Sequence, residues 1–264
     1  MLYLFSHLRE LRSKIEGRYL FLFLDFDGTL TPIVKTPDKA IISRETRNLL
    51  GLLLQKNNCK IAIISGRALP DIKKKLGFKN IIYSGNHGFQ IEGPGIKYEL
   101  PLPLVYRKTL QQIKGQLEKE LNGLGGIFVE DKKFSLALHY RLAEKKYLKF
   151  IKAVFHKAVI MFLIKNKIRI RKGKKVLEVK PPTNWDKGKA ALWLLARQRL
   201  VLKGGAILPV YIGDDVTDED AFRVFKKKGL TVFVGKPGNS AANYYLKNPR
   251  EVIKFLRLIS KFRK

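Results

Sequence analysis

The pattern of hydrophobic positions predicts buried strands that alternate with helices. Continuous apolar runs, typical of strands buried on both faces of a parallel sheet, occur at 19–26, 60–64, 80–84, 209–212 and 230–234. Segments with apolar residues at helical spacing lie at 3–17, 44–55, 71–76, 187–200, 219–227 and 249–262. This alternation predicts an α/β fold of the Rossmann-like, doubly wound class with a parallel sheet.

The middle of the chain has a different pattern of hydrophobic positions, which begins after Leu100-Pro101-Leu102-Pro103. It predicts helices at 109–121 and 147–164, a half-buried strand at 134–140, and a hairpin of 168–171 with 175–179. The pattern ends at Pro181-Pro182. We therefore expect an α+β cap domain at 105–182, inserted into a core formed by 1–104 and 183–264.

Composition and length indicate a folded domain protein without a membrane span. Of 264 residues, 45% are hydrophobic and 28% charged. The single cysteine, Cys59, excludes a disulfide framework within the chain. No apolar run approaches the ~20 residues that a membrane span needs, and the N-terminus lacks a signal-peptide run. We expect a cytoplasmic protein.

The net charge of +31 is unusual and has three possible explanations. They are a lysine-rich composition with solvated faces, a field that attracts an anionic substrate, and contact with nucleic acid. Basic residues interleave with apolar ones, as in 147–155, and form no separate basic arm. No nucleic-acid-binding motif is present, so the third explanation is the least favoured.

The scarce acidic residues are concentrated. Five of the 22 lie between Asp214 and Asp220, and Asp25 and Asp27 end the strongest predicted strand. Carboxylates kept together in a basic chain indicate a cation site.

Polar residues follow three predicted strands at the edge where open α/β sheets bind ligands. These groups are Asp25-Phe26-Asp27-Gly28-Thr29, Ser65-Gly66-Arg67 and Gly213-Asp214-Asp215. Lys187 opens the helix that follows the insertion. We expect these four groups to converge in space.

Such a set suits phosphoryl transfer. Asp25 and Asp214 offer carboxylates to Mg²⁺, and the metal with Lys187 would neutralise phosphoryl oxygens while Asp25 attacks phosphorus. Asp27 could protonate the leaving oxygen and later activate water. Ser65 can donate a hydrogen bond to phosphate. Gly28 and Gly66 permit tight turns with backbone N–H groups aimed at the anion.

Each feature alone also has a simpler explanation. Asp25 to Gly28 could be a turn or the start of a calcium loop, although Leu30, Pro32 and Ile33 supply no further ligands. Ser65-Gly66 could be a turn, Lys187 a surface lysine, and 214–220 a solvated helix start. Their joint occurrence at four element ends favours one catalytic site.

These residues resemble the four ordered motifs of the haloacid dehalogenase superfamily: Asp25-Phe26-Asp27-Gly28-Thr29-Leu30, Ser65, Lys187 and Gly213-Asp214-Asp215. Further segments resemble the trehalose-6-phosphate phosphatases: Ile64-Ser65-Gly66-Arg67, Gly85-Asn86-His87-Gly88, Val129-Glu130-Asp131-Lys132-Lys133, His139-Tyr140-Arg141, Glu178-Val179-Lys180-Pro181, Asp186-Lys187-Gly188 and 213–222. They occur in family order between Leu24 and Phe222. Phe26 departs from the family, which often has Tyr there.

The resemblance implies roles for individual residues. Asp25 would be the nucleophile and Asp27 the general acid and base, while Ser65 and Lys187 hold the phosphoryl group. Mg²⁺ would be held by Asp25, the backbone carbonyl of Asp27, and Asp214, supported by Asp215 or Asp218. The implied substrate-binding residues are Gly28, Gly66, Arg67, Asn86, His87, Glu130, Lys132, Arg141, Lys174 or Lys175, and Glu178.

The implied reaction is hydrolysis of trehalose 6-phosphate to trehalose and phosphate through an aspartyl-phosphate. The open alternatives are another sugar phosphate, such as sucrose phosphate or mannosylglycerate phosphate, and a basic nucleic-acid-binding protein on this scaffold. The intact catalytic motifs disfavour the last. We expect a monomer that acts on a small sugar phosphate without a membrane partner. Because 264 residues leave no room for a fused sugar transferase, the trehalose-phosphate synthase would be a separate protein.

Overall fold

The computed structural model describes residues 1–173, 175–203 and 206–262. The chain forms two compact units, one of Met1–Glu99 with Trp185–Lys264 and the other of Leu100–Asn184. We call them the core unit and the inserted unit. Lys174, one of the two alternative lysines expected at the substrate, lies outside the described residues.

The core unit is built on one large sheet. Among the described residues its nine strands follow the order β1-β13-β12-β11-β2-β3-β4-β5-β6. Their bounds are Leu2–Tyr3 (β1), Tyr19–Leu24 (β2), Cys59–Ile64 (β3), Ile82–Gly85 (β4), Gln90–Gly93 (β5), Ile96–Glu99 (β6), Ile207–Gly213 (β11), Leu230–Val234 (β12) and Tyr244–Leu246 (β13). Pairing is parallel from β1 to β4 in this order and antiparallel from β4 to β6.

The order of the strands marks where a ligand should bind. From β2 the chain proceeds to β3 and β4 on one side, whereas from β11 it proceeds to β12 and β13 on the other. The topological switch therefore lies between β2 and β11, where Leu24 pairs with Ile212. In open α/β sheets the ligand crevice lies beyond the carboxyl ends of the strands at such a switch.

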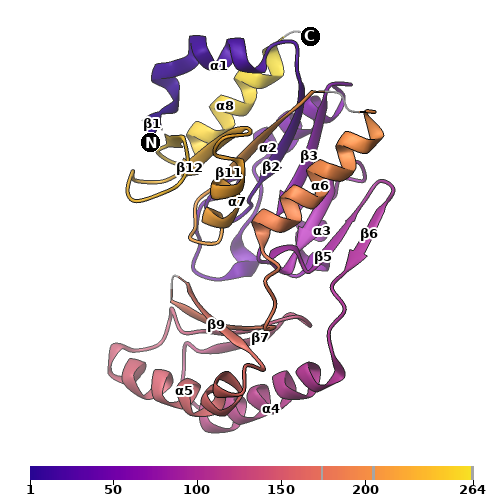
Figure 1. The fold of residues 1–264 in the computed structure, drawn as a ribbon. Coiled ribbons are helices and arrows are strands. Elements are labelled where there is room, and N and C mark those ends of the chain that lie inside the picture. The colour runs from indigo at the N-terminus through magenta and orange to yellow at the C-terminus, as the bar shows by residue number, and fades with distance from the viewer. Residues whose placement is uncertain (174, 204–205, 263–264) are drawn as a thin grey trace. The chain divides into compact units, whose positions relative to one another are not determined.

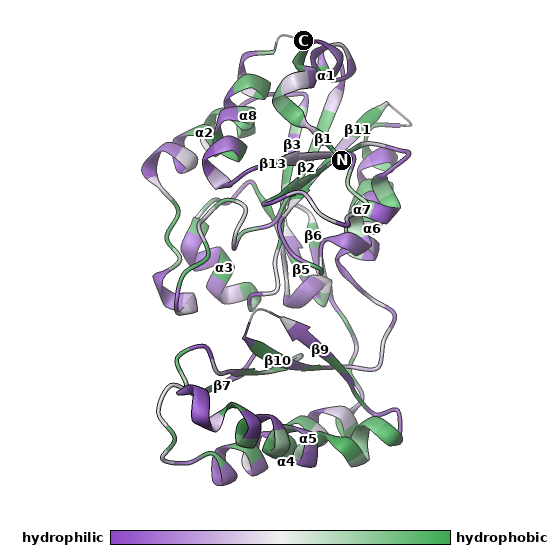
Figure 2. Ribbon diagram, turned by 90° about the vertical axis from the view of Figure 1, so that its left-hand side faces the viewer, coloured by the Kyte–Doolittle hydropathy of each residue, from purple (hydrophilic) through white to green (hydrophobic). Residues whose placement is uncertain are grey.

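Helices cover both faces of this sheet (Figure 1). Their bounds are Leu8–Ile15 (α1), Arg44–Leu54 (α2), Leu69–Leu76 (α3), Lys187–Val201 (α6), Glu219–Phe225 (α7) and Pro249–Lys261 (α8). Along β2, Leu20, Leu22 and Leu24 pack with α1, α2, α3 and α8, while Phe21 and Phe23 pack with α6 and α7. A strand buried on both faces explains the continuous apolar run, and Figure 2 shows the central strands as largely hydrophobic. The predicted doubly wound fold is confirmed.

Local sequence signals fix where several helices begin. The side chains of Ser43, Asp186 and Asn248 cap α2, α6 and α8 by accepting hydrogen bonds from backbone N–H groups. The Asp186 cap places Lys187 at the first position of α6, where its side chain is buried.

The inserted unit has its own sheet and its own hydrophobic core. Its elements are Leu104–Glu120 (α4), Phe128–Asp131 (β7), Leu136–His139 (β8), Leu148–Ile164 (α5), Arg169–Gly173 (β9) and Val176–Lys180 (β10). The antiparallel sheet has the order β7-β8-β10-β9, and its core combines residues of α4 and α5 with Leu136, Leu138, Leu177 and Val179. Because side chains alternate along a strand, Glu178 and Lys180 lie on the opposite face of the sheet.

Several sequence-based expectations were wrong or incomplete. Residues 3–17 do not form one helix: Leu2–Tyr3 is a strand, Leu4–His7 a 3₁₀ helix, and only Leu8–Ile15 is α-helical. The short N-terminal strand pairs with β13, a contact that local periodicity cannot reveal. The strands β5, β6, β7 and β13 were not predicted, and α4 begins five residues before the expected 109. Within the described residues, no helix combines the length and apolar character that a membrane span requires.

Candidate active site

The loops after β2 and β11 bring three carboxylates together. The backbone N–H of Asp25 donates to the carbonyl of Ile212 at 2.9 Å, which ties the end of β2 to β11. One carboxylate oxygen each of Asp25, Asp214 and Asp218 lies within 4.8 Å of the others. The topology of the switch point thus joins residues that the sequence separates widely.

Lys187 brings a positive charge to this cluster. Its Nζ donates to Oδ1 of Asp25 at 2.7 Å and to Oδ1 of Asp218 at 2.9 Å, and all three side chains are buried. Burial alone would lower the pKa of Lys187, but the charges of Asp218 and Asp25 outweigh it and raise that pKa. Lys187 therefore stays positively charged beside the expected nucleophile.

Asp218 accepts hydrogen bonds from three groups of the cluster. Its Oδ1 also accepts from the hydroxyl of Tyr211 at 2.8 Å, and its Oδ2 accepts from the backbone N–H of Asp215 at 3.0 Å. Burial and the nearby charge of Asp218 raise the pKa of Tyr211 well above its ordinary value, so the hydroxyl keeps its proton and donates. Sequence analysis did not single out Tyr211, because this residue lies within the apolar strand β11.

Glycines allow the loops to approach these carboxylates. Gly28 has φ +84°, and a Cβ placed there would lie 2.2 Å from Oδ2 of Asp214. A Cβ on Gly213 would lie 2.3 Å from Cγ of Asp218. Gly28 thus contributes its left-handed turn and its lack of a side chain, which lets Asp214 sit against the backbone of the first loop.

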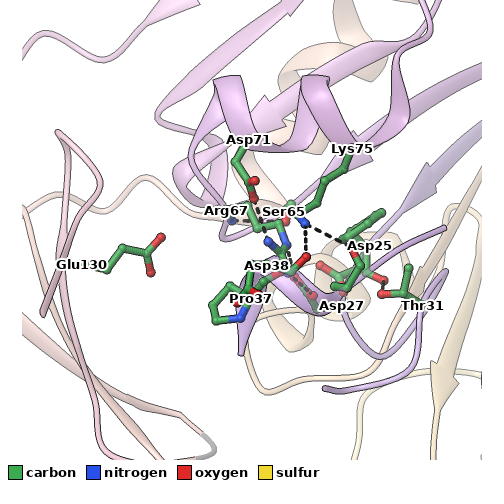
Figure 3. Close-up of polar contacts among 12 residues, drawn as sticks. Asp25, Asp27, Thr31, Pro37, Asp38, Ser65, Arg67, Asp71, Lys75 and Glu130 are labelled. Atoms are coloured by element: carbon green, nitrogen blue, oxygen red, sulfur yellow. Dashed lines mark hydrogen bonds and ion pairs between the residues drawn. The ribbon is translucent and has the colours of Figure 1, made fainter. Parts of the chain in front are cut away.

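Asp27 is held by Arg67, as Figure 3 shows. The Nε and Nη2 atoms of Arg67 donate to Oδ2 and Oδ1 of Asp27 at 2.6 and 2.7 Å. Such a bidentate pair fixes both the position and the plane of the carboxylate. Asp27 lies only two positions after Asp25 in the chain, yet its side chain is held by Arg67 rather than by the carboxylate cluster.

The loops after β3 and β4 interlock. Oγ of Ser65 accepts from the backbone N–H of Arg67 at 3.2 Å, and the carbonyl of Ser65 accepts from the backbone N–H of His87 at 2.9 Å. Asn86 and His87 adopt the left-handed region with φ 51° and 58°. A Cβ on Gly66 would lie 2.6 Å from the His87 ring. The structure therefore groups four expected substrate residues, although no hydrogen bond joins Ser65 to Asp25 among the described residues.

The inserted unit carries a buried charge network on the polar face of its sheet. Glu178 accepts from Oγ of Ser135 at 2.9 Å and pairs with Lys132 at 3.4 Å and Lys180 at 3.3 Å. Burial lowers the pKa of Lys180 to about 8, although Glu178 opposes this. The network brings together two of the expected sugar-binding residues, Lys132 and Glu178.

Three further expected residues of the inserted unit lie near or beyond this network. Glu130 lies 3.8 Å from Lys132 and 2.8 Å from Nε2 of His139. Burial would raise the pKa of Glu130, but the hydrogen bond with His139 and the charge of Lys132 lower it. Arg141 follows β8 in an exposed turn, and Lys175 is exposed with φ 66°.

The charge balance of the core cluster suits a divalent cation. Lys187 pairs with Asp25 and Asp218, and Asp214 adds a third carboxylate beside them. Burial raises the pKa of Asp25 well above its ordinary value, Lys187 opposes this, and Asp218 and Asp214 add to it. A bound cation would favour the ionised carboxylates. Because Asp218 already accepts three hydrogen bonds, Asp25 and Asp214 are the better candidates for direct ligands.

Comparison with known proteins gives one consistent result. The family model of the trehalose-phosphatases matches residues 23–249. The chain is 34% identical over 267 residues to trehalose-phosphate phosphatase B of Arabidopsis thaliana, covering 97% of this chain and 70% of that protein. It is 36% identical over 266 residues to the probable trehalose-phosphate phosphatase 4 of Oryza sativa subsp. japonica, covering 98% and 71%.

A solved structure agrees with the sequence matches. The C-terminal domain of the C. albicans trehalose-6-phosphate phosphatase superposes with a TM-score of 0.82 at 28% identity, covering 100% of this chain and 99% of that one. This likeness extends over both units. The resemblance predicted from the sequence motifs is thereby confirmed, and the chain belongs to the trehalose-phosphatase family of the haloacid dehalogenase superfamily.

Proposed function

We propose that this protein hydrolyses trehalose 6-phosphate to trehalose and inorganic phosphate in trehalose biosynthesis. The observation that carries the proposal is the contact of Lys187 with Asp25 inside a carboxylate cluster at the topological switch of a trehalose-phosphatase fold. A carboxylate paired with a buried cation is arranged to approach a phosphate dianion, whose charge would otherwise repel it.

The reaction would proceed in two steps. A carboxylate oxygen of Asp25 attacks phosphorus, the bond to the sugar oxygen breaks, and Asp27 supplies the proton to that oxygen. Asp27 then removes a proton from water, which attacks phosphorus and breaks the acyl-phosphate bond. Phosphate leaves and the Asp25 carboxylate is restored. Lys187 neutralises charge on the phosphoryl group in both steps.

Mg²⁺ fits the core cluster, and Asp25 and Asp214 would hold it, with Asp218 and Asp215 supporting their positions. When bound, it would act as a Lewis acid that withdraws charge from the phosphoryl oxygens. Oxygen ligands with two carboxylates are what Mg²⁺ prefers in phosphate-binding sites.

The inserted unit would select the sugar. Its buried network presents carboxylates and ammonium groups together, which suits hydroxyls that both donate and accept hydrogen bonds. We place Glu130, Lys132, Arg141 and Glu178 in this role. We further propose a monomeric enzyme that receives its substrate from a separate trehalose-phosphate synthase.

Phosphate release from a panel of sugar phosphates tests the function. Trehalose 6-phosphate should give a higher kcat/KM than sucrose 6-phosphate, mannosylglycerate phosphate or glucose 6-phosphate. EDTA should abolish release and Mg²⁺ should restore it. A preference for another sugar would keep the phosphatase chemistry and reject the substrate, whereas full activity in Asp25→Asn would reject the mechanism.

A further inference from the structure

All three nitrogen atoms of the Arg67 guanidinium group donate hydrogen bonds within the core unit. Besides the two bonds to Asp27, Nη1 donates to Oδ2 of Asp71 at 2.7 Å, and Nη2 donates to the carbonyl of Pro37 at 2.8 Å. Four of the five N–H groups of an arginine are thus used within the core unit. The guanidinium carbon also lies 5.3 Å from the centre of the Phe26 ring.

Arg67 is more deeply buried than the two aspartates that it contacts. The Arg67 side chain is 8% exposed, whereas the side chains of Asp27 and Asp71 are 40% and 41% exposed. The carboxylate that must exchange protons with substrate and water therefore remains accessible, and the group that holds it is buried.

Asp71 anchors Arg67 to a rigid element. It lies in the first turn of α3, whose buried residues Leu69, Ile72 and Leu76 pack into the core. The same helix binds the segment around Pro37, because Nζ of Lys75 donates to the carbonyls of Asp38 and Ala40 at 3.1 and 3.0 Å. Figure 3 shows Asp71 and Lys75 on α3, with Arg67 between the helix and Asp27.

We propose that Arg67 and Asp71 form a positioning pair for Asp27, rather than a part of the substrate-binding surface. The proposal rests on the acid–base role given to Asp27 above. The planar fork of Arg67 fixes the plane of the Asp27 carboxylate, and Asp71 fixes Arg67 on α3. Since proton transfer requires hydrogen-bond geometry, a misplaced carboxylate transfers its proton poorly.

This arrangement predicts a specific pattern of lost activity. A lysine at position 67 has one nitrogen and cannot bridge both Asp27 oxygens, Asp71 and Pro37 at once. Arg67→Lys should therefore reduce turnover where leaving-group protonation matters, by roughly ten- to a hundredfold. Turnover should change much less where the leaving group needs no proton. Asp71→Asn, which keeps the shape and removes the charge, should give a smaller loss of the same kind.

The test uses a series of aryl phosphates of decreasing leaving-group acidity, from p-nitrophenyl phosphate to phenyl phosphate, with the full-length protein. The expected dependence on the leaving group is shallow for the wild type, steep for Asp27→Asn, and intermediate for Arg67→Lys and Asp71→Asn. In the Asp27→Asn background, adding Arg67→Lys should change the rates by less than about threefold, because residues that act as a unit are not additive.

Lys75→Gln is the matched control, because Lys75 lies on the same helix and binds the same segment without touching Asp27. It should keep the wild-type leaving-group dependence even if the melting temperature falls. A melting curve for each variant separates unfolding from misplacement, and Asp71→Asn serves if Arg67→Lys does not fold.

Two results would contradict different parts of this proposal. A loss that is equal for all leaving groups and persists in the Asp27→Asn background would mean that Arg67 contacts the phosphoryl group, and would overturn the proposal. A shallow dependence in Asp27→Asn itself would overturn the acid–base role instead. Because aryl phosphates carry no sugar, the result does not depend on trehalose 6-phosphate being the substrate.

Discussion

Nζ of Lys187 lies 2.7 Å from Oδ1 of Asp25, although 162 positions separate the two residues in the chain. The contact exists because α6 begins immediately after the inserted unit and packs against Phe21 and Phe23 of β2. It joins the end of the first large strand to the point where the chain re-enters the core. The same ion pair should therefore contribute both to the stability of the core unit and to the proposed reaction.

Lys187→Met tests both contributions. Removing one partner of a buried ion pair leaves uncompensated charge, so we expect the free energy of unfolding to fall by about 3 kcal/mol. Phosphatase activity should fall below detection even at temperatures where the variant is folded. Lys189→Met, on the same helix but about half exposed at its side chain, should change neither property appreciably. Normal turnover in Lys187→Met would rule out the assigned role.

Gly28→Ala tests the close contact between the first loop and Asp214. A methyl group there would displace the Asp214 carboxylate, in addition to the strain of a left-handed alanine. We expect the Mg²⁺ concentration for half-maximal activity to rise at least about tenfold, as when the support of a metal ligand is lost. The measurement is a Mg²⁺ titration of phosphate release.

Gly95→Ala is the control for Gly28→Ala. Gly95 also has a left-handed φ, of +68°, but a Cβ there meets nothing within 4 Å. It should cost roughly 1 kcal/mol of stability through strain and leave the Mg²⁺ titration unchanged. Identical titrations for the two alanine variants would show that Asp214 tolerates the added methyl group.

The sequence predicted the parts of the fold that depend on burial. The strands ending at Leu24, Ile64 and Gly213 are apolar on both faces, and such runs identify the centre of a parallel sheet without any knowledge of partners. The strands at Leu2–Tyr3 and Tyr244–Leu246 are short and lie at one edge of the sheet. Each is stabilised by pairing with a distant segment, so local periodicity could not find them.

The hairpin of β5 and β6 is a different case, because its signal was present. Gly93-Pro94-Gly95 separates Ile91 from Ile96 and Tyr98, which stand at alternate positions, and a glycine-rich turn between such segments is typical of a hairpin. At the site, the sequence identified the groups at the strand ends but not their supports. Tyr211 sits inside an apolar run, and Asp71 resembles any acidic residue in the first turn of a helix.

Lys180 provides a pH-dependent test of the inserted unit. Burial lowers the pKa of its folded state to about 8, whereas a lysine in an unfolded chain titrates near 10.4. Between these values the unfolded state binds more protons, so the contribution of Lys180 to the free energy of unfolding rises with pH. From pH 7 to 10 this rise should be on the order of 2 kcal/mol.

Denaturant titrations of the wild type and Lys180→Met across that pH range measure the difference. The stability of the wild type relative to Lys180→Met should increase toward pH 10, because the variant cannot titrate. Lys172→Met, an exposed position on the neighbouring strand β9, should follow the wild type. Parallel curves for the wild type and Lys180→Met would mean that Lys180 keeps an ordinary pKa.

Glu178 is the residue on which sugar selection should depend most. It is 7% exposed, and its carboxylate is held by Ser135, Lys132 and Lys180, so its orientation is fixed before a substrate arrives. Removing such a preorganised carboxylate should weaken substrate binding strongly, because a buried polar partner left without a hydrogen bond costs about 1–3 kcal/mol. Glu178→Ala should therefore lower kcat/KM for trehalose 6-phosphate by roughly ten- to a hundredfold.

The same substitution should barely change the hydrolysis of p-nitrophenyl phosphate, which has no sugar hydroxyls to bind, if Glu178 acts on the sugar. Glu178→Gln keeps the volume and one acceptor oxygen, so it should lose less activity on trehalose 6-phosphate than Glu178→Ala. Glu118→Ala, at an exposed position of α4, controls for a change of charge in the inserted unit. A parallel fall for both substrates would show that Glu178 maintains the fold of this unit. An unchanged kcat/KM for both would remove Glu178 from the sugar site and reopen the choice of substrate, because selectivity would then have to come from Glu130, Lys132 or Arg141.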